Sequence, residues 1–161
     1  MAATKRSQAR SKKAAKPAAR KGAAKRRTAK APAKGLQLRS GAPGLTVNDI
    51  AKSMTWYCDV LGFAVKQRWE QDGVLHGGEL TAGGATLFIG QDDWKKGRDR
   101  IKGEGVRLYL HLKTGREVDR LAADIKARGG ALASEPHDEW GVRSFNLEDP
   151  SGYKITVSSG G

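Results

Sequence analysis

The stretch LTVNDIAKSMTWYCDVLGF, residues 45–63, joins a strand pattern to a helix pattern. Residues 45–47 alternate apolar and polar side chains, as in a half-buried strand. Asn48 or Asp49 can then cap a helix, because its side chain accepts a hydrogen bond from a first-turn amide. Gly62 is typical of a helix end. Between these limits one apolar stripe recurs at helical spacing, formed by Ile50, Met54, Tyr57 and Leu61.

Strand-like segments follow this helix. Asp72-Gly73 and Gly83-Gly84 supply turns of the kind that join hairpin strands. The runs between the turns are rich in apolar and β-branched residues, which favours strands. They cover Phe63–Trp69, Val74–Leu80 and Ala85–Ile89.

The second half of the sequence repeats this order. A strand is predicted at Val106–Leu112, and a helix at Glu117–Arg128 with Val118, Leu121 and Ile125 as its apolar stripe. Gly129-Gly130 ends the helix. Short strands are predicted at Ala131–Ser134, Arg143–Leu147 and Tyr153–Val157. The order β-α-β-β-β therefore occurs twice, which indicates an α+β fold built from an internal repeat.

Charge divides the chain into two parts. Residues 1–36 hold 13 of the 30 Lys and Arg residues and no Asp or Glu, so residues 37–161 carry 17 basic and 17 acidic side chains. The folded domain is thus expected at 37–161 with no formal net charge. The arm at 1–36 consists mainly of Ala, Lys, Arg and Pro and lacks the apolar side chains needed for a core, which predicts disorder.

A basic arm of this composition resembles the tails of linker histones and of histone-like bacterial proteins. It predicts weak, non-specific contact with nucleic-acid phosphates that salt weakens. The arm holds no aromatic side chain for stacking on single-stranded bases. A solubilising tail without a dedicated partner is the alternative. Under the first reading, the phosphate contacts come from Lys12, Lys13, Lys25, Arg26 and Arg27.

The cysteine content and the lengths of the apolar runs indicate the cellular compartment. Cys58 is the single cysteine, which excludes an internal disulfide and a cysteine-based zinc cluster. No apolar run is long enough to span a bilayer, and the N-terminus lacks the apolar segment of a secretory signal. We expect a cytoplasmic protein without membrane contact, with nucleoid association as an extension through the arm. An organellar transit peptide is the minority alternative.

Two motifs together carry a family resemblance. The opening stretch at residues 45–63 and the stretch DEWGVRSFNLEDPSGYKITV at residues 138–157 resemble the start and end of a vicinal-oxygen-chelate domain. This superfamily includes glyoxalase I, bleomycin-resistance proteins, fosfomycin-resistance enzymes and extradiol dioxygenases. The resemblance covers roughly residues 40–159. It implies two βαβββ modules that form a curved mixed sheet around a cleft, and a homodimer.

Alternation along the strands predicts which side chains face this cleft. One face of each strand is aliphatic and should pack under the helices. The opposite face is mixed and polar and should face the cleft. Two tryptophans in loops are expected to border the cleft, and an arginine in the closing motif is expected to make it cationic. The predicted ligand-binding residues are Phe88, Trp94, Arg107, Tyr109, His111, Trp140, Arg143 and Thr156. For Trp94, which lies in the polar loop at residues 91–105, a packing role is an equal alternative.

The resemblance also implies three metal-ligand positions, which here hold Ala42, Arg107 and Thr156. Alanine has no donor atom, arginine is a fixed cation, and threonine is a poor ligand beside histidine or a carboxylate. No metal or other cofactor is therefore predicted. The three histidines, His76, His111 and His137, show no metal-ligand spacing and are expected to be ordinary polar side chains.

Three functions remain open from the sequence. The first is metal-free binding of a small aromatic or anionic molecule in the cleft, with no catalytic residue assigned. The second is a metal-dependent lyase or isomerase of the glyoxalase type, which needs a metal or a general base that the three positions do not supply. The third is a DNA-associated protein that acts through its basic arm.

Overall fold

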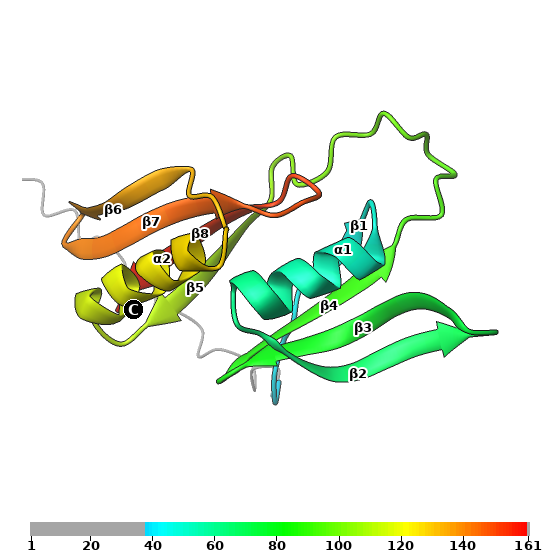
Figure 1. Cartoon of the computed structure of the whole chain (residues 1–161), viewed down its shortest axis with the longest axis horizontal. Coiled ribbons are helices and arrows are strands. Elements are labelled where there is room, and N and C mark those ends of the chain that lie inside the picture. Colours follow the sequence, from blue (N-terminus) through cyan, green and yellow to red (C-terminus); the bar gives the residue numbers. More distant parts are fainter. Residues whose placement is uncertain (1–37, 161) are drawn as a thin grey trace, which may run out of the picture. The chain divides into compact units, whose positions relative to one another are not determined.

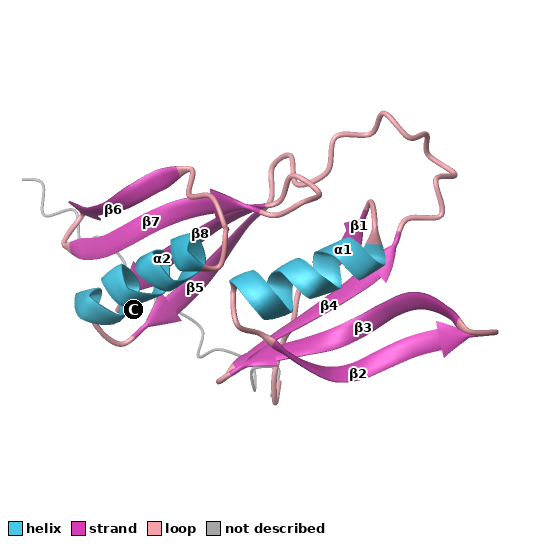
Figure 2. Cartoon of the chain, in the orientation of Figure 1, coloured by secondary structure: helices cyan, strands magenta, loops and turns pink. Residues whose placement is uncertain are grey.

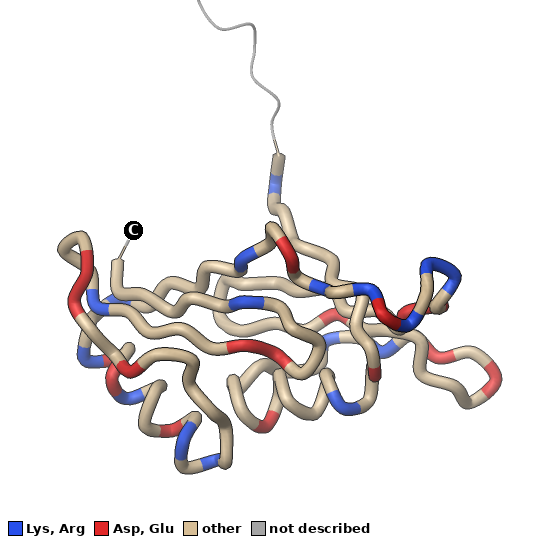
Figure 3. The backbone as a smooth tube through the Cα atoms, turned by 90° about the horizontal axis from the view of Figure 1, so that it is seen from above, with Lys and Arg blue, Asp and Glu red and all other residues tan. Residues whose placement is uncertain are grey.

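A computed structural model gives the fold and describes residues 38–160. The chain divides into two units, Met1–Gln37 and Leu38–Gly161. The predicted basic arm and its phosphate contacts lie outside the described residues. All 17 basic and 17 acidic side chains of the second unit lie within them, and the two signs are interspersed along the chain (Figure 3). In this part of the chain no helix is long and apolar enough to cross a membrane.

The first module begins with strand β1, Gly44–Val47, and helix α1, Ile50–Thr55. The side chain of Asp49 caps the helix by accepting a hydrogen bond from the Lys52 amide at 2.9 Å. The helix continues as a π-helical turn, η1, at Trp56–Val60. Three strands follow and complete a sheet in the order β1-β4-β3-β2 (Figure 1). They are β2 at Ala64–Gln71, β3 at Val74–Ala82 and β4 at Ala85–Gln91.

The second module repeats the arrangement. Its helix α2, Gly115–Ala127, starts at a capping box in which Thr114 and Glu117 each bond the other's backbone amide. The sheet has the order β5-β8-β7-β6 (Figure 2). In both sheets the first strand pairs in parallel with the fourth, and the remaining pairs are antiparallel. The strands are β5 at Arg107–Leu112, β6 at Ser134–Glu139, β7 at Val142–Glu148 and β8 at Lys154–Ser159. The predicted α+β fold of two βαβββ modules is confirmed.

Strand β6 corrects one sequence prediction. A strand was expected at Ala131–Ser134, whereas β6 covers Ser134–Glu139. This strand lies at the sheet edge, is polar throughout and has an irregular register around Pro136, which has no amide hydrogen to donate. It therefore lacks the apolar alternation by which the other strands are found. As a result His137, expected in a loop, lies on β6.

The core lies between each helix and its sheet. The predicted stripe of the first helix is buried, and Tyr57 within it has no exposed surface. In α2, Val118 and Ile125 are fully buried, while Leu121 is half-buried and Ala122 takes its place in the core. Strands β1, β3, β4, β5, β7 and β8 contribute their aliphatic faces to the same core, which leaves their other faces open, whereas every residue of β2 is exposed.

The turn after β7 joins the two modules. Its Asp149 carboxylate accepts hydrogen bonds from the Ser151 and Tyr153 amides, both at 2.8 Å, and from the Tyr57 hydroxyl at 3.1 Å. The Tyr153 hydroxyl in turn donates to the Thr46 carbonyl on β1 at 3.1 Å. Burial raises the pKa of Asp149 and that of Tyr57. The turn of the second module is thus attached to the core and the first strand of the first module.

Candidate functional site

The open face of the second sheet carries rows of polar side chains. Residues at paired positions of neighbouring strands share a face of the sheet. Tyr109 on β5 pairs with Thr156 on β8, which pairs with Asn146 on β7. His111 and Ser158 begin a second row, and Ser144 continues it. The register thus confirms the predicted common face of the β5 and β8 side chains.

A hydrogen-bond network fixes Arg107 on this face. Its Nη1 donates to the Asn146 side-chain oxygen at 3.0 Å and to the Thr156 hydroxyl at 2.9 Å. The Thr156 hydroxyl donates to the same Asn146 oxygen at 2.7 Å. The Asn146 side-chain amide then donates to the Ser134 hydroxyl at 3.1 Å. The guanidinium is therefore held by neutral oxygens that are themselves bonded to one another.

Arg107, Asn146 and Thr156 line a hollow of about 500 Å³. This is within the size range of sites for small organic molecules. Nδ1 of His111 shares a hydrogen bond of 3.0 Å with the Ser158 hydroxyl on its wall. The hollow brings together five of the residues predicted from sequence, Arg107, Tyr109, His111, Trp140 and Thr156.

Trp140 stands at the tip of the β6–β7 hairpin. It has a φ angle of 51°, and Gly141 after it has 83°. Its side chain is 94% exposed, so little protein packs against it. A left-handed conformation is unfavourable for a bulky residue. The fold thus holds an exposed indole at the rim of the hollow without a packing reason for it.

Arg143 does not join this group. It precedes Ser144 on β7 and therefore projects to the helix side of the sheet. There its Nε contacts the Asp119 carboxylate of α2 at 2.9 Å, and this contact raises the Arg143 pKa. The arrangement gives Arg143 a structural ion pair, and its predicted contact with a ligand has no support from its position.

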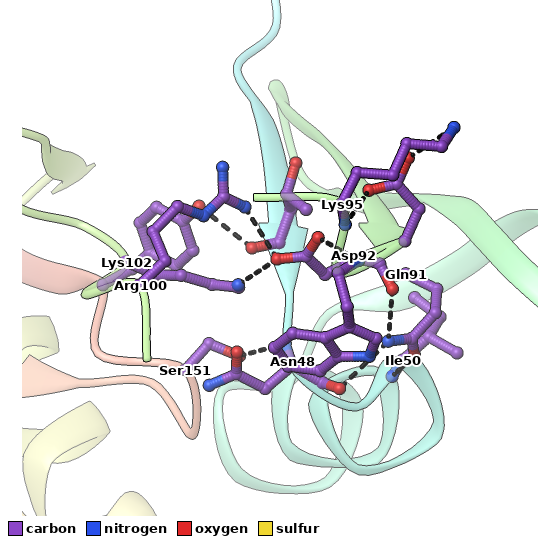
Figure 4. A network of polar contacts seen from close by, with 12 residues as sticks. Asn48, Ile50, Gln91, Asp92, Lys95, Arg100, Lys102 and Ser151 are labelled. Atoms are coloured by element: carbon purple, nitrogen blue, oxygen red, sulfur yellow. Dashed lines mark hydrogen bonds and ion pairs between the residues drawn. The ribbon is translucent and has the colours of Figure 1, made fainter. Parts of the chain in front are cut away.

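Trp94 lies in the loop between β4 and β5. Asp92 in this loop is buried and bonds Arg100 at 2.7 Å and the nearly inaccessible Lys102, both of which point toward it (Figure 4). The Lys102 bond and the Trp94 amide lower the pKa of Asp92 to about 2. The Trp94 ring lies 4.8 Å from the Lys102 ammonium, and the Arg98 guanidinium lies 4.9 Å away. These contacts favour the packing role of Trp94.

Phe88 lies on the first sheet instead. Its ring stacks on Trp69 with a centroid distance of 5.8 Å and an interplanar angle of 29°. The Trp69 ring covers Gly77, where an added Cβ would lie 2.7 Å from Cε3 of the indole. Sequence reasoning missed Trp69, although it ends a predicted strand and its pairing with Gly77 places it on the open face.

A second cavity, of about 380 Å³, lies where the two modules meet. Pro43 and Thr86 line it from the first module, and Leu108 lines it from the second. Arg107 and Tyr109 border both this cavity and the hollow on the second sheet. The two spaces therefore share a boundary, and β5 forms it.

The three positions implied as metal ligands do not fit a divalent ion. Ala42 presents only a methyl group, and the Thr156 hydroxyl is engaged by Arg107 and Asn146. A guanidinium repels a metal cation. Within residues 38–160 no group of three or more His, Cys, Asp or Glu side chains is arranged to hold a metal ion.

Comparison with known proteins agrees with this fold. The sequence profile of the Glyoxalase/Bleomycin resistance protein/Dioxygenase superfamily matches residues 39–157, so the chain belongs to this superfamily. Comparison with the curated proteins gives no significant match.

Solved structures with low sequence identity share the fold. A glyoxalase/bleomycin resistance protein/dioxygenase from Nocardioides is 18% identical with a TM-score of 0.63, covering 78% of this chain and 86% of that one. TioX from Micromonospora sp. ML1 is also 18% identical, with a TM-score of 0.61 and coverage of 73% and 95%. A glyoxalase/bleomycin resistance protein/dioxygenase from Alicyclobacillus acidocaldarius is 15% identical, with a TM-score of 0.60 and coverage of 76% and 94%. At these identities the likeness concerns the fold.

Proposed function

We propose that this protein binds a small aromatic or anionic molecule in the hollow of the second sheet, without a divalent metal ion. The observation that carries this proposal is the network of Arg107, Asn146 and Thr156, which holds a cation in a hollow that the exposed Trp140 also lines. The hollow combines fixed polar groups, which can orient a small molecule, with the two aromatic side chains of Tyr109 and Trp140. The superfamily serves many chemistries, so the function is argued from this site.

The network favours binding over a purely structural role. An arginine that only stabilises the fold is expected to pair with a carboxylate, as Arg143 does with Asp119. Arg107 has no carboxylate within ion-pair distance among the described residues, and its bonded partners are neutral. A charged group that is already held in one orientation loses less conformational entropy when a ligand binds.

A thermal-shift screen of aromatic and anionic metabolites, followed by calorimetry of the hits, tests the proposal. Wild type is compared with Thr156→Val, which keeps the side-chain volume and removes the hydroxyl that bonds Arg107. The matched control is Arg120→Gln, on the exposed surface of α2. We expect hits that Thr156→Val weakens and Arg120→Gln leaves unchanged. A screen without any hit contradicts the proposal.

Metal analysis of protein purified without chelator tests the metal-free part. We expect substoichiometric metal content and unchanged ligand affinity after treatment with EDTA. A stoichiometric transition metal that is required for binding would favour the glyoxalase-type enzyme instead. It would also show that the side chains at Ala42, Arg107 and Thr156 are not the relevant ligand set.

We also propose that the basic arm contacts nucleic acid without sequence preference. The supporting observation is the charge partition, since the arm holds 13 basic and no acidic residues and the rest of the chain is formally neutral. Gel retardation of full-length protein, compared with a shortened chain that starts at Leu36, tests it. Binding should fall steeply with salt and be lost on shortening. Equal binding by both chains would contradict the assignment to the arm.

A further inference from the structure

We infer that the hollow on the second sheet takes an aromatic carboxylate, with the carboxylate on Arg107 and the ring against Trp140. This inference rests on the proposed function and names the ligand class of the same site. Three observations support it. The Arg107 guanidinium has N–H donors that make no hydrogen bond within the described residues, the charges around it leave room for an anion, and Trp140 lies at a strained backbone position.

The guanidinium retains capacity for a ligand. In residues 38–160 its hydrogen bonds run through Nη1 alone, to Asn146 and Thr156. The N–H groups on Nε and Nη2 remain available, and a planar fork of this kind matches the two oxygens of a carboxylate. Because Nη1 is fixed on two sides, the fork is oriented before a ligand arrives, which lowers the entropy cost of binding.

The charges around Arg107 suit a single negative charge. Lys154 is its neighbour across the β5–β8 pair, and Glu148 pairs with Lys154 on the next strand. Glu139 also lines the hollow, and its carboxylate lies 3.5 Å from Nε2 of His137. Among the described residues that line the hollow, Arg107 is the one Lys or Arg side chain, and both partners of its Nη1 are neutral. A monoanion matches it, whereas a dianionic phosphate generally calls for more donors.

The aromatic part of the ligand is inferred from Trp140. An indole at a φ angle of 51° is kept at a cost in backbone strain, and with 94% exposure it gains almost nothing from packing. Tyr109, 62% exposed, lies on the same hollow. Exposed aromatic side chains with few rotatable bonds are efficient contacts for a flat apolar ring.

The position of Arg107 can be compared with the metal-ligand positions of the metal-dependent relatives that the sequence resembles. Arg107 occupies one of the positions implied as metal ligands, where it cannot hold a metal. It supplies the positive charge of the site by itself, as part of the protein. The anionic group of a ligand would then accept hydrogen bonds from the Arg107 guanidinium and would not coordinate a metal ion.

The test uses 2-naphthoate and its neutral amide, 2-naphthamide, measured by calorimetry on the full-length protein. We expect the acid to bind about tenfold more tightly than the amide, which is the usual value of one charge-assisted hydrogen bond. Arg107→Gln should abolish this difference, and Arg107→Lys should retain part of it. Trp140→Asn should weaken acid and amide alike, and Arg120→Gln should change neither affinity. Circular dichroism confirms that each variant is folded.

Each outcome has a defined meaning. Equal affinity for acid and amide, with both weakened by Trp140→Asn, overturns the carboxylate inference while the proposed function stands. The same holds if neither probe binds but a neutral compound from the screen does so in the hollow. Naphthoate binding that neither Arg107→Gln nor Trp140→Asn affects places the probe elsewhere and overturns the inference. Failure of all compounds removes the proposed function together with the inference.

Discussion

Two hairpin turns at equivalent places in the modules have nearly the same backbone but different residues. Asp72-Gly73 joins β2 to β3 with φ angles of 51° and 75°, and Trp140-Gly141 joins β6 to β7 with 51° and 83°. Asp-Gly is a favourable pair for such a turn, because Asp tolerates the left-handed region. Trp does not share this advantage. Both modules use the same turn, and only the first has a residue at the first position that favours it.

The open faces of the two sheets differ in the same way. On the first sheet Trp69 and Phe88 stack on each other, and the Trp69 ring covers Gly77. On the second sheet the corresponding surface holds the network around Arg107. The repeated order of elements fixes the backbone and the buried stripe, while the open faces are free to diverge. Function in a repeated fold is therefore best sought where the two halves differ.

The largest expected effects come from the core that the modules share. Leu80→Ala in the first module and Leu147→Ala in the second should each lower the free energy of unfolding by about 3 kcal/mol. Both side chains are fully buried or nearly so. Urea unfolding is followed by tryptophan fluorescence and by far-UV circular dichroism. Because the turn at Asp149 connects the modules, we expect one transition with coincident midpoints in each variant.

Val74→Ala provides the control, since Val74 is 56% exposed and should change stability by less than about 0.5 kcal/mol. Two separate transitions, with Leu80→Ala moving one and Leu147→Ala the other, would show that the modules fold independently. In that case the contacts around Asp149 would not couple them.

Tyr57→Phe tests the connection itself. It removes the hydroxyl that donates to the Asp149 carboxylate inside the core. A buried acceptor left without this partner should lower the free energy of unfolding by about 1–3 kcal/mol. Tyr109→Phe, at an exposed position, should have almost no effect in the same urea titration. Equal effects of the two substitutions would mean that the buried hydrogen bond does not stabilise the domain.

The loop between β4 and β5 should show a pH dependence through Asp92. Its pKa in the folded protein is about 2, lowered chiefly by Lys102 and the Trp94 amide, against about 3.9 in an unfolded chain. A lowered pKa contributes stability that is fully present above the unfolded value and is lost as the pH falls toward the folded value. The stability advantage of wild type over Asp92→Asn should therefore shrink between about pH 5 and pH 2.

Thermal melts of the two proteins across this range measure the difference. Asp149, whose pKa is raised, titrates in both proteins and cancels in the comparison. The pKa of Asp93 is lowered chiefly by Lys95 and raised in part by the Asp92 charge, so Asp92→Asn lowers it further, and Asp92→Asn/Asp93→Asn compared with Asp93→Asn removes this contribution. An advantage that stays constant down to pH 2 would show that Asp92 is not paired with Lys102 in solution.

Sequence reasoning reached most of the fold and part of the site, for physical reasons that particular residues show. The helical stripe, the turn glycines and strand alternation report local geometry, so both modules and the face of Arg107, Tyr109 and Thr156 could be predicted. Strand β6 was not predicted at its true position, because this polar edge strand has no alternation of apolar and polar side chains. Alternation along β7 indicates on which face Asn146 lies, but not that it has a role in the site. That role depends on hydrogen bonds to Arg107 and Thr156, which lie 39 and 10 residues away in the sequence. Trp94 packs against Lys102 and Arg98, and Arg143 pairs with Asp119, and only the tertiary structure shows these contacts.

The smallest effect tests the comparison of the two turns directly. Trp140→Asn places a favourable residue in the left-handed position, so we expect the free energy of unfolding to rise by about 0.5 kcal/mol. Asp72→Trp in the other turn should lower it by a similar amount. Urea unfolding measures both, and Lys113→Asn, outside either turn, serves as the control. If Trp140→Asn also weakens naphthoate binding while it stabilises the fold, the indole is maintained for the ligand against the preference of the backbone. If it destabilises the protein, Trp140 has a packing role and its place at the hollow no longer argues for a ligand.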